Sequence, residues 1–351
     1  DENVRKAIAM GIDRESLVKN FYPEGSEVAT HFTPCAIPFG CEGDDTWGFD
    51  AAAAKQLLTT ANFDFSKTYK ISFRNAVRGY LPDPPQIATE IQTQLLANLG
   101  IKTSLDVQES GAFLDNNAAG KLPGLFLLGW GADYPDATNF LDYHFGSGSG
   151  KKFGTPFPDV VAALNKGAQS ADDATRKAAY GEANNLIKQH AIAAIIAHGG
   201  SGTVFKADVT GAHSSPLSNE IFSVMQAASR DTLVWMQNAE PLSLYCGDET
   251  DGETLRACEA INESLYAYKV GGTDVEPALA TECKPNADLT TWTCTLRDGV
   301  TFGDGATFDA NDVVASFAAE WDTKNKNHIG RSGAFEYLPG LFGGFLNPPA
   351  S

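Results

Sequence analysis

Apolar residues recur at helical spacing through the first sixty residues. Val4, Ala7 and Ile8 fall on one face of a helix that ends near Gly11. Asp13 and Asp50 each stand just before a helix-forming stretch, where an aspartate side chain can accept the first free backbone N–H groups. The pattern therefore predicts three helices, at about 2–11, 14–21 and 51–61.

Strand and helix periodicities then alternate. Residues 68–75 (TYKISFRN) and 101–109 alternate as strands do, with Ile101, Leu105 and Val107 on one side of the second. Between them an apolar residue recurs every fourth position from Ile87 to Leu99, and Gly100 ends that helix. This order predicts a right-handed βαβ unit with parallel strands, and hence an α/β fold class with ligands at the strand ends.

The rest of the chain carries shorter patterns, and we expect the following elements. Helices are predicted at 111–119, as a polar pair within 157–190, at 257–268 with Cys258, Ile261 and Leu265 on one face, and after Asp309, with Asp312 three residues further on. Strands are predicted in LPGLFLLGW, AIAAIIAHGG (191–200), TLVWMQ (232–237) and WTCTLRDGV. Residues 226–231 form a polar seam, and 338–351 show no regular pattern.

Six cysteines fall into three local pairs, Cys35 with Cys41, Cys246 with Cys258 and Cys283 with Cys294. An even number in nearby pairs favours disulfides and an oxidising compartment. Other pairings stay open from sequence alone. Zinc is the alternative, but there is no CxxC pair and the histidines are scattered, so we expect no metal site.

Charge excludes one class of partner. The formal net charge is −18, and both halves of the chain are acidic. Nucleic acid requires a basic surface, so we expect no nucleic-acid partner. No apolar run reaches the length of a membrane span.

Several blocks together resemble one family. TLRDGVTFGDGATFDANDVVASF is similar to the block near the start of the large extracellular solute-binding proteins (family 5) that feed peptide and nickel ABC importers. NVRKAIAMGIDRESLV resembles a block past the middle of that family. LLTTANF, IQTQLLANLGIKTSLDVQ and GWGADYPDATNFL follow it in family order.

The resemblance implies a bilobal periplasmic-binding-protein-like fold, type II of the large cluster C kind. Because the blocks stand in inverted order and a central block is missing, we expect a circularly permuted, incomplete arrangement. It would have a C-terminal-type ligand-binding lobe at 1–190, part of the N-terminal-type lobe at 191–270 with a join at 226–231, and an incomplete subdomain at 271–351. The missing block would lie in an upstream segment of the same gene.

The resemblance also places the ligand site. In peptide-binding members the acid of a GW-x-x-D block pairs with the peptide's α-ammonium, and Asp133 stands at that position. Further ligand-binding candidates are Trp130, Gly131, Tyr134, Asn139, Ser243, Leu244 and Tyr245. The alternative for Asp133 is capping of the next helix, for which Asp136 competes. Trp130 could equally fill the core. Arg74 and Arg78 could meet a ligand carboxylate but are better explained as solvated surface.

The predicted function is capture of a solute, foremost an oligopeptide, by lobe closure, and its delivery to the membrane subunits of an ABC importer, with no enzymatic activity and no cofactor. An extracytoplasmic location follows, in the periplasm or at the cell surface, with a lipid anchor possible through an upstream segment. Asp248, Asp251 and Glu253 are interpreted as a solvated acidic loop. Alternatives are another solute (oligosaccharide, opine or metal chelate), a secreted hydrolase using His198 near Ser201, or a surface protein without transport.

Overall fold

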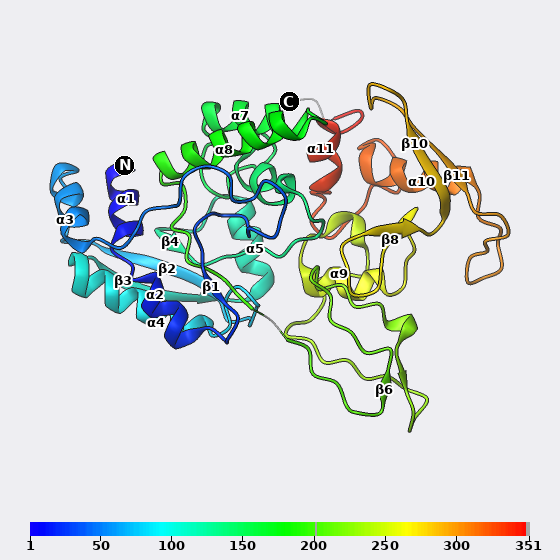
Figure 1. Ribbon diagram of the computed structural model, residues 1–351, viewed down its shortest axis with the longest axis horizontal. Coiled ribbons are helices and arrows are strands. Elements are labelled where there is room, and N and C mark those ends of the chain that lie inside the picture. The colour runs from blue at the N-terminus through cyan, green and yellow to red at the C-terminus, as the bar shows by residue number, and fades with distance from the viewer. Residues whose placement is uncertain (201, 349–351) are drawn as a thin grey trace. The chain divides into compact units, whose positions relative to one another are not determined.

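The chain folds into two compact units. The computed structural model describes residues 1–200 and 202–348 (Figure 1). Unit 1 comprises Asp1–Gly202 and unit 2 comprises Thr203–Ser351.

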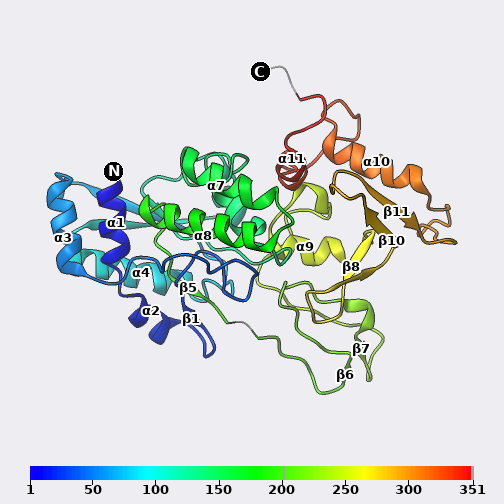
Figure 2. The ribbon, with the colours of Figure 1, turned by 45° about the horizontal axis from the view of Figure 1, so that its top comes forward.

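A three-stranded parallel sheet lies at the centre of unit 1. Strand β2 (Thr68–Arg74) pairs along its whole length with β3 (Lys102–Gln108) and, on its other edge, with β4 (Leu125–Phe126). Helix α4 (Pro84–Gln94) connects β2 to β3 and packs against both strands (Figure 2). It continues into the π-helix η1 (Leu95–Leu99), which ends at Gly100 with a left-handed φ of 76°. The βαβ unit and the α/β fold class are therefore confirmed.

Strand β3 is an edge strand, and the side chains predicted to share its apolar face differ in burial. Ile101, just before the strand, is buried at 1% exposure, but Leu105 and Val107 are exposed to 37% and 59%. Their alternation was predicted, but their side of the strand lacks a packed cover within unit 1. Within the described residues β3 has a strand neighbour on one edge, β2, and its helical packing comes from α4 and from η1, which continues α4.

Helices surround the sheet and begin where the sequence predicts. Besides α4, the longer helices of unit 1 are α1 (Glu2–Met10), α2 (Arg14–Phe21), α3 (Ala51–Thr60), α5 (Ser110–Ala118), α7 (Pro158–Ala168) and α8 (Asp173–Gln189). Asp13 accepts a hydrogen bond from the Ser16 N–H at 3.0 Å, and Asp50 accepts one from the Ala53 N–H at 2.9 Å. Both predicted caps are confirmed.

Two apolar clusters form the core of unit 1. The first lies between α1–α4 and the sheet and includes Leu17, Leu58, Ile71 and Ile87. The second lies between α7, α8 and residues 137–145, and Tyr180 is fully buried within it. The second cluster packs against the GWGADYPDATNFL block (129–141) and includes the residues Ala137, Phe140 and Leu141 of that block.

The predicted strand at 191–200 is largely wrong. Only β5 (Ala197–His198) forms, paired antiparallel with the equally short β1 (Glu27–Val28). Ala194 and Ile196, just before it, pack against the first core cluster, and the Ile196 carbonyl accepts a hydrogen bond from the Ala29 N–H at 3.2 Å. An apolar run of this length cannot by itself distinguish a strand from packed irregular chain.

Unit 2 is built from short elements. They are β6 (Val209–Thr210), η3 (Phe222–Val224), β7 (Gln226–Ala227), η4 (Cys246–Asp248), α9 (Gly252–Glu259), β8 (Tyr266–Tyr268), β9 (Val275–Pro277), β10 (Ala280–Pro285), β11 (Trp292–Leu296), α10 (Ala310–Trp321) and α11 (Tyr337–Phe342). The strands pair as three separate antiparallel ribbons, β6–β7, β8–β9 and β10–β11 (Figure 1).

The three predicted disulfides and the predicted cap at Asp309 are confirmed. All three expected pairs are bonded, Cys35–Cys41, Cys246–Cys258 and Cys283–Cys294. The last joins directly opposite residues of the β10–β11 hairpin. Asp309 and Asp312 form a reciprocal capping box at the start of α10.

Three predictions in unit 2 are wrong. Residues 232–237 belong to no strand. Helix α9 ends at Glu259, which leaves Ile261 65% exposed, and Tyr266 then begins β8. Helix α11 forms at 337–342, where no pattern was expected. In each case the outcome depends on which neighbour is available for packing or pairing, and a local pattern does not record that.

Candidate functional site

Asn139 holds the GWGADYPDATNFL block together. It lies in the π-helix η2 (Thr138–Asp142), which continues into α6 (Tyr143–Phe145), and it is fully buried. Its Oδ1 accepts a hydrogen bond from Trp130 Nε1 at 3.0 Å and another from the backbone N–H of Asp133 at 3.0 Å. One amide oxygen thus uses both lone pairs to fix the loop. Trp130, Asp133 and Asn139 are brought together.

Trp130 is half-buried, and its indole ring packs against two neighbouring rings. The indole stacks on Tyr143 with ring centroids 4.3 Å apart and meets His144 edge-on at 4.9 Å. Gly131 beside it is exposed, and a Cβ there would meet nothing within 4 Å. The indole is therefore a rigid part of the loop, with a core role on at least one face.

Asp136 performs the capping role that was the alternative for Asp133. Its Oδ1 accepts hydrogen bonds from the N–H and the hydroxyl of Thr138 at 2.9 and 2.7 Å. Its other oxygen pairs with Arg176 of α8 at 2.6 Å. Asp133 itself is half-buried. Its ligand role stays a prediction, and the helix start does not require it.

The side chains packed against the block include acidic groups and are largely buried from solvent. Burial, together with the nearby charge of Asp136, raises the pKa of Asp142 to about 7. Burial also raises the pKa of Tyr134, which accepts a hydrogen bond from Thr138 at 3.3 Å, and that of Tyr180. Burial lowers the pKa of His144 to about 3, so this imidazole is neutral. Burial at this place therefore disfavours a charge of either sign on these side chains.

Sequence reasoning missed the residues that contact these acids. Arg176 and Tyr180 come from α8, far along the chain from Asp136 and Asp142. The only available sequence pattern was the placement of an arginine and a tyrosine four residues apart on one helix face. Nothing in that spacing identifies the acids that they meet.

Arg74 and Arg78 differ in their surroundings. Arg74, at the end of β2, is 6% exposed and donates to Ser110 Oγ at 2.9 Å and to Tyr80 Oη at 3.2 Å. The expectation of a solvated surface is therefore wrong for Arg74, because its guanidinium joins the strand end to α5 and to the next loop. Arg78 forms an isolated bridge with Leu81.

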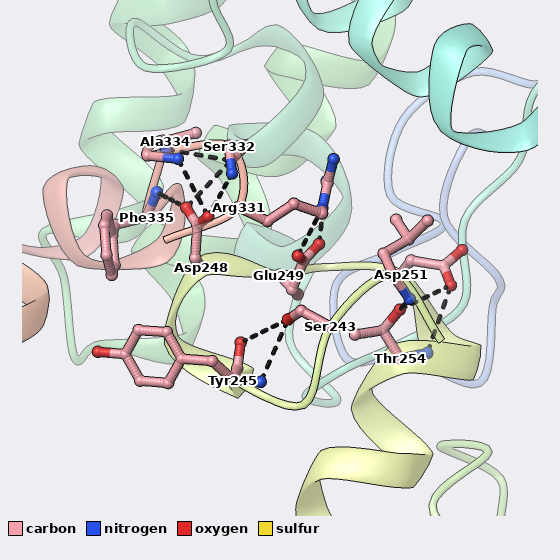
Figure 3. Close-up of polar contacts among 12 residues, drawn as sticks. Ser243, Tyr245, Asp248, Glu249, Asp251, Thr254, Arg331, Ser332, Ala334 and Phe335 are labelled. Carbon is pink, nitrogen blue, oxygen red and sulfur yellow. Dashed lines mark hydrogen bonds and ion pairs between the residues drawn. The ribbon is translucent and has the colours of Figure 1, made fainter. Parts of the chain in front are cut away.

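The candidates of unit 2 lie on one loop, shown in Figure 3. Ser243 Oγ accepts a hydrogen bond from the Tyr245 N–H at 3.1 Å, which curls the loop, and Leu244 is 59% exposed. Burial raises the pKa of Tyr245 to about 12. Tyr245 also lines a groove of roughly 320 Å³ with Phe302 of the preceding turn and with Asp312, Ala315, Ser316, Ala319 and Glu320 of α10.

The acids that follow this loop are buried and fully engaged (Figure 3). Asp248 is 4% exposed and accepts hydrogen bonds from Ser332, Gly333 and Phe335 at 2.7–3.0 Å. Burial alone would raise the pKa of Asp248, but these donors outweigh it and lower the pKa. Glu249 pairs with Arg331 through both oxygens, at 2.7 and 3.1 Å.

The interpretation of a solvated acidic loop is therefore wrong. Asp251 caps α9 by accepting from the Thr254 N–H, and Glu253 pairs with Arg256 at 2.7 Å. The Cys246–Cys258 disulfide ties the same loop to α9. The acids serve to anchor residues 243–249 to neighbouring chain, a role for which their sequence spacing gave no indication.

The described ranges contain neither a cluster of metal-ligating side chains nor a membrane-spanning helix. Within residues 1–200 and 202–348, no group of three or more His, Cys, Asp or Glu side chains is placed to hold a metal ion. None of the helices in those ranges is both long and apolar enough to cross a bilayer. His198 pairs opposite Glu27, and burial lowers its pKa. Ser201 lies outside the described residues.

Solved structures identify the class of fold. The dipeptide-binding protein of Pseudoalteromonas sp. SM9913, solved with Met-Leu, is 25% identical and superposes with a TM-score of 0.55, over 60% of this chain and 42% of that one. An oligopeptide-binding protein of Borrelia burgdorferi, 22% identical, shares the fold at a TM-score of 0.57, over 64% of this chain and 45% of that one. The fold is thus that of the periplasmic peptide-binding proteins.

The family follows from the sequence match. The model for bacterial extracellular solute-binding proteins, family 5, matches residues 1–152 and 274–336, which is more than half of the chain. The chain belongs to this family.

Curated relatives are binding proteins. Di/tripeptide-binding protein 2 of Pseudomonas aeruginosa (strain UCBPP-PA14) is 28% identical over 229 residues, which cover 64% of this chain and 42% of the relative. The dipeptide-binding protein DppE of Bacillus subtilis is 28% identical over 198 residues, 53% of this chain and 35% of the relative. The chain spans less than half the length of either relative.

Proposed function

We propose that this protein captures a short peptide and passes it to the membrane subunits of an ABC importer. The observation that carries the proposal is the loop in which Asn139 fixes Trp130 and Asp133 together. The names of the curated relatives, which are di- and tripeptide-binding proteins, support the ligand class. Capture and release require no covalent chemistry, so we propose no enzymatic activity and no cofactor.

In this proposal Asp133 pairs with the peptide's α-ammonium. Asn139 fixes the loop backbone through the Asp133 N–H. Asp136 caps the helix start, so the Asp133 carboxylate is not required for that purpose. Trp130, Gly131, Tyr134 and Asn139 would shape the same site.

Ser243, Leu244 and Tyr245 are proposed as contacts from the other lobe. Their loop is anchored by the disulfide at Cys246 and by Asp248, so it could present backbone groups without a large cost in ordering. Closure of two lobes around the ligand would then stabilise the closed form. One proposed lobe is 1–190. The other comprises 191–270, which includes the join at 226–231, together with the subdomain 271–351.

Location and partners belong to the same proposal. The family is extracellular by name, and one relative is the periplasmic murein peptide-binding protein MppA of Escherichia coli. We therefore propose an extracytoplasmic location, with a lipid anchor supplied by an upstream segment. Circular permutation would account for the inverted order of the family blocks, and that upstream segment would carry the central block.

Calorimetric titration with Ala-Ala and with N-acetyl-Ala-Ala tests the proposal. We expect binding of the first and at least tenfold weaker binding of the second, because acetylation removes the ammonium group. Asp133→Asn should weaken Ala-Ala binding at least tenfold and leave N-acetyl-Ala-Ala unchanged. Asp173→Asn is the matched control, because Asp173 is an exposed acid of the same unit.

Three results would count against the proposal. If acetylation and Asp133→Asn both leave the affinity unchanged, then Asp133 does not bind the amine. Mass spectrometry that finds a sugar or metal chelate released from the purified protein would identify a different solute. Turnover of the peptide, or absence of any thermal shift with small solutes, would favour a hydrolase or a surface protein without transport.

A further inference from the structure

Two histidines of unit 1 each have a ring nitrogen that is closed off from solvent and lacks a partner. His31 is 4% exposed, and its Nδ1 lies 3.0 Å from the Thr30 hydroxyl. The Nε2 atoms of His31 and His198 are both buried, and neither makes a hydrogen bond within residues 1–200 and 202–348. Buried polar atoms without a partner are uncommon in folded proteins, so this pair calls for a physical explanation.

Both histidines belong to a short pairing between distant parts of the chain. Strand β5 pairs with β1 (Figure 2), and the register places His198 opposite Glu27. We call segments 26–31 and 195–200 together the β1–β5 clasp. The second segment precedes Thr203, the first residue of unit 2. The clasp therefore fixes to unit 1 the stretch of chain that leads onward from it.

Individual hydrogen bonds flank the two paired residues of the clasp. The Ala29 N–H donates to the Ile196 carbonyl at 3.2 Å, and the Gly200 N–H donates to Ser26 Oγ at 2.9 Å. Each bond joins residues more than 160 positions apart in the chain. A pairing this short can open locally while the helices around it stay folded. These two amides therefore report whether the clasp is closed.

A neutral imidazole fits this place, and an imidazolium does not. A neutral ring carries one N–H and leaves the other nitrogen bare, whereas protonation adds a charge and an N–H at an Nε2 atom that has no acceptor. Burial lowers the pKa of His198, and the charge of Glu27 and a backbone hydrogen bond with His31 offset this only in part. A charge on the nearby His31 ring lowers it further, because the two imidazolium groups would repel each other.

Charged side chains of both signs surround the clasp. The acids are Glu27, opposite His198, and Glu24, whose backbone lies against Gly200. The bases are Arg14 of α2, which donates to two carbonyl groups of the clasp at 2.5 and 3.2 Å, and Arg78, from the loop that packs against residue 199. Because these charges balance, a proton on a buried ring would add a charge that its surroundings do not compensate.

We propose that His31 and His198 form an acid-opened lock on the β1–β5 clasp. While both rings are neutral, the clasp is closed. Protonation draws the imidazoles toward water and separates segment 26–31 from segment 195–200. The opened chain binds protons that the closed clasp excludes, so the closed form loses stability as the pH falls below about 6.5, the ordinary pKa of histidine. The proposal concerns unit 1 and does not depend on peptide capture.

Hydrogen exchange on the full chain, corrected for the intrinsic effect of pH on exchange, tests the proposal. Protection of the Ala29 and Gly200 amides should fall at least about fivefold between about pH 7.5 and pH 5. This fall should follow the titration of the His198 ring measured by NMR. Protection within α8 should not fall over the same range. The readout is local because Asp142 acts on stability in the opposite direction.

Substitutions identify the rings that respond to acid. His198→Asn should remove most of the pH response, and the double variant with His31→Asn should remove the rest. His198→Lys should keep the clasp open at about pH 7.5, because its charge is permanent at that pH. His190→Asn is the matched control and should keep the response, because His190 belongs to the same unit but has carboxylate partners at both ring nitrogens.

Two results would overturn the proposal. The first is unchanged protection of the two amides in the unsubstituted protein while the His198 ring becomes protonated. The second is an equal acid-induced loss of protection in the unsubstituted protein and in the double variant. If a substitution itself opens the clasp at every pH, the comparison of exchange with ring titration in the unsubstituted protein decides. Circular dichroism spectra matching that protein establish that each variant is folded.

Discussion

The indole Nε1 of Trp130 lies 3.0 Å from the side-chain oxygen of Asn139, nine residues later and fully buried. The same oxygen accepts from the backbone of Asp133. A buried amide thus fixes the conformation of the loop, and the exposed parts of the loop remain available for other contacts.

Asn139→Ala should destabilise unit 1. The substitution leaves two buried donors, the Trp130 indole and the Asp133 N–H, without their acceptor, and this costs about 2–4 kcal/mol. Denaturant unfolding measures the loss. Asn20→Ala removes an exposed asparagine hydrogen bond and should cost less than about 0.5 kcal/mol. Equal losses in the two variants would show that Asn139 does not hold the loop.

Two glycines of the same loop should respond oppositely to alanine. A Cβ at Gly129 would lie 2.3 Å from ring atoms at the base of Tyr80, whose hydroxyl accepts from Arg74. Gly129→Ala should therefore cost about 1–3 kcal/mol, because the ring must shift. Gly131→Ala meets open space and should be nearly neutral. Comparable thermal midpoints for the two variants would contradict this geometry.

Asp142 should make stability fall as the pH rises. Its pKa is about 7 in the folded chain and 3.8 without the fold, so the folded state binds the extra proton between these values. That contribution is fully favourable below about pH 4 and is lost by pH 8. Asp142→Asn should remove up to about 3 kcal/mol of the difference in unfolding free energy between pH 5 and pH 8. Asp173→Asn should leave that difference unchanged.

Asp248→Ala should release residues 331–335. The carboxylate accepts from three backbone N–H groups there, and its loss leaves them without an acceptor, at a cost of about 2–4 kcal/mol. Hydrogen exchange at those amides should accelerate. Asp304→Ala removes an exposed acceptor of the same unit and serves as the control. Unchanged protection in the Asp248 variant would rule out this anchoring role.

Reduction of the Cys246–Cys258 disulfide should loosen the loop that carries Ser243 and Tyr245. A closed loop of this size contributes about 3 kcal/mol, largely by restricting the unfolded chain. The double variant Cys246→Ser with Cys258→Ser should show faster exchange at 243–249. Removal of Cys35–Cys41, in the other unit, should leave that exchange as it was.

Much of unit 1 could be predicted because its patterns are local. The βαβ unit follows from residues that are close in the chain, and Asp13 and Asp50 cap the helices that immediately follow them. The strand predicted at 232–237 does not form, since a strand requires a neighbour and the neighbour is not encoded in the segment.

The same reasoning applies to the site. The GW-x-x-D block could be found because its residues are consecutive. The Asp136–Arg176 pair joins residues 40 apart, and Asp248 meets its donors more than 80 residues later. Such contacts arise from tertiary folding, and therefore the acids near 248 looked solvated in the sequence although they are buried.

Both apolar clusters found among the described residues lie in unit 1, whereas unit 2 depends on short ribbons, two disulfides and buried acids. The two units should then melt at different temperatures, and a single midpoint would not describe the protein. Warming would first soften the loop at 243–249 while the helices of unit 1 persist. A helical signal would therefore overestimate the temperature to which that loop keeps its shape.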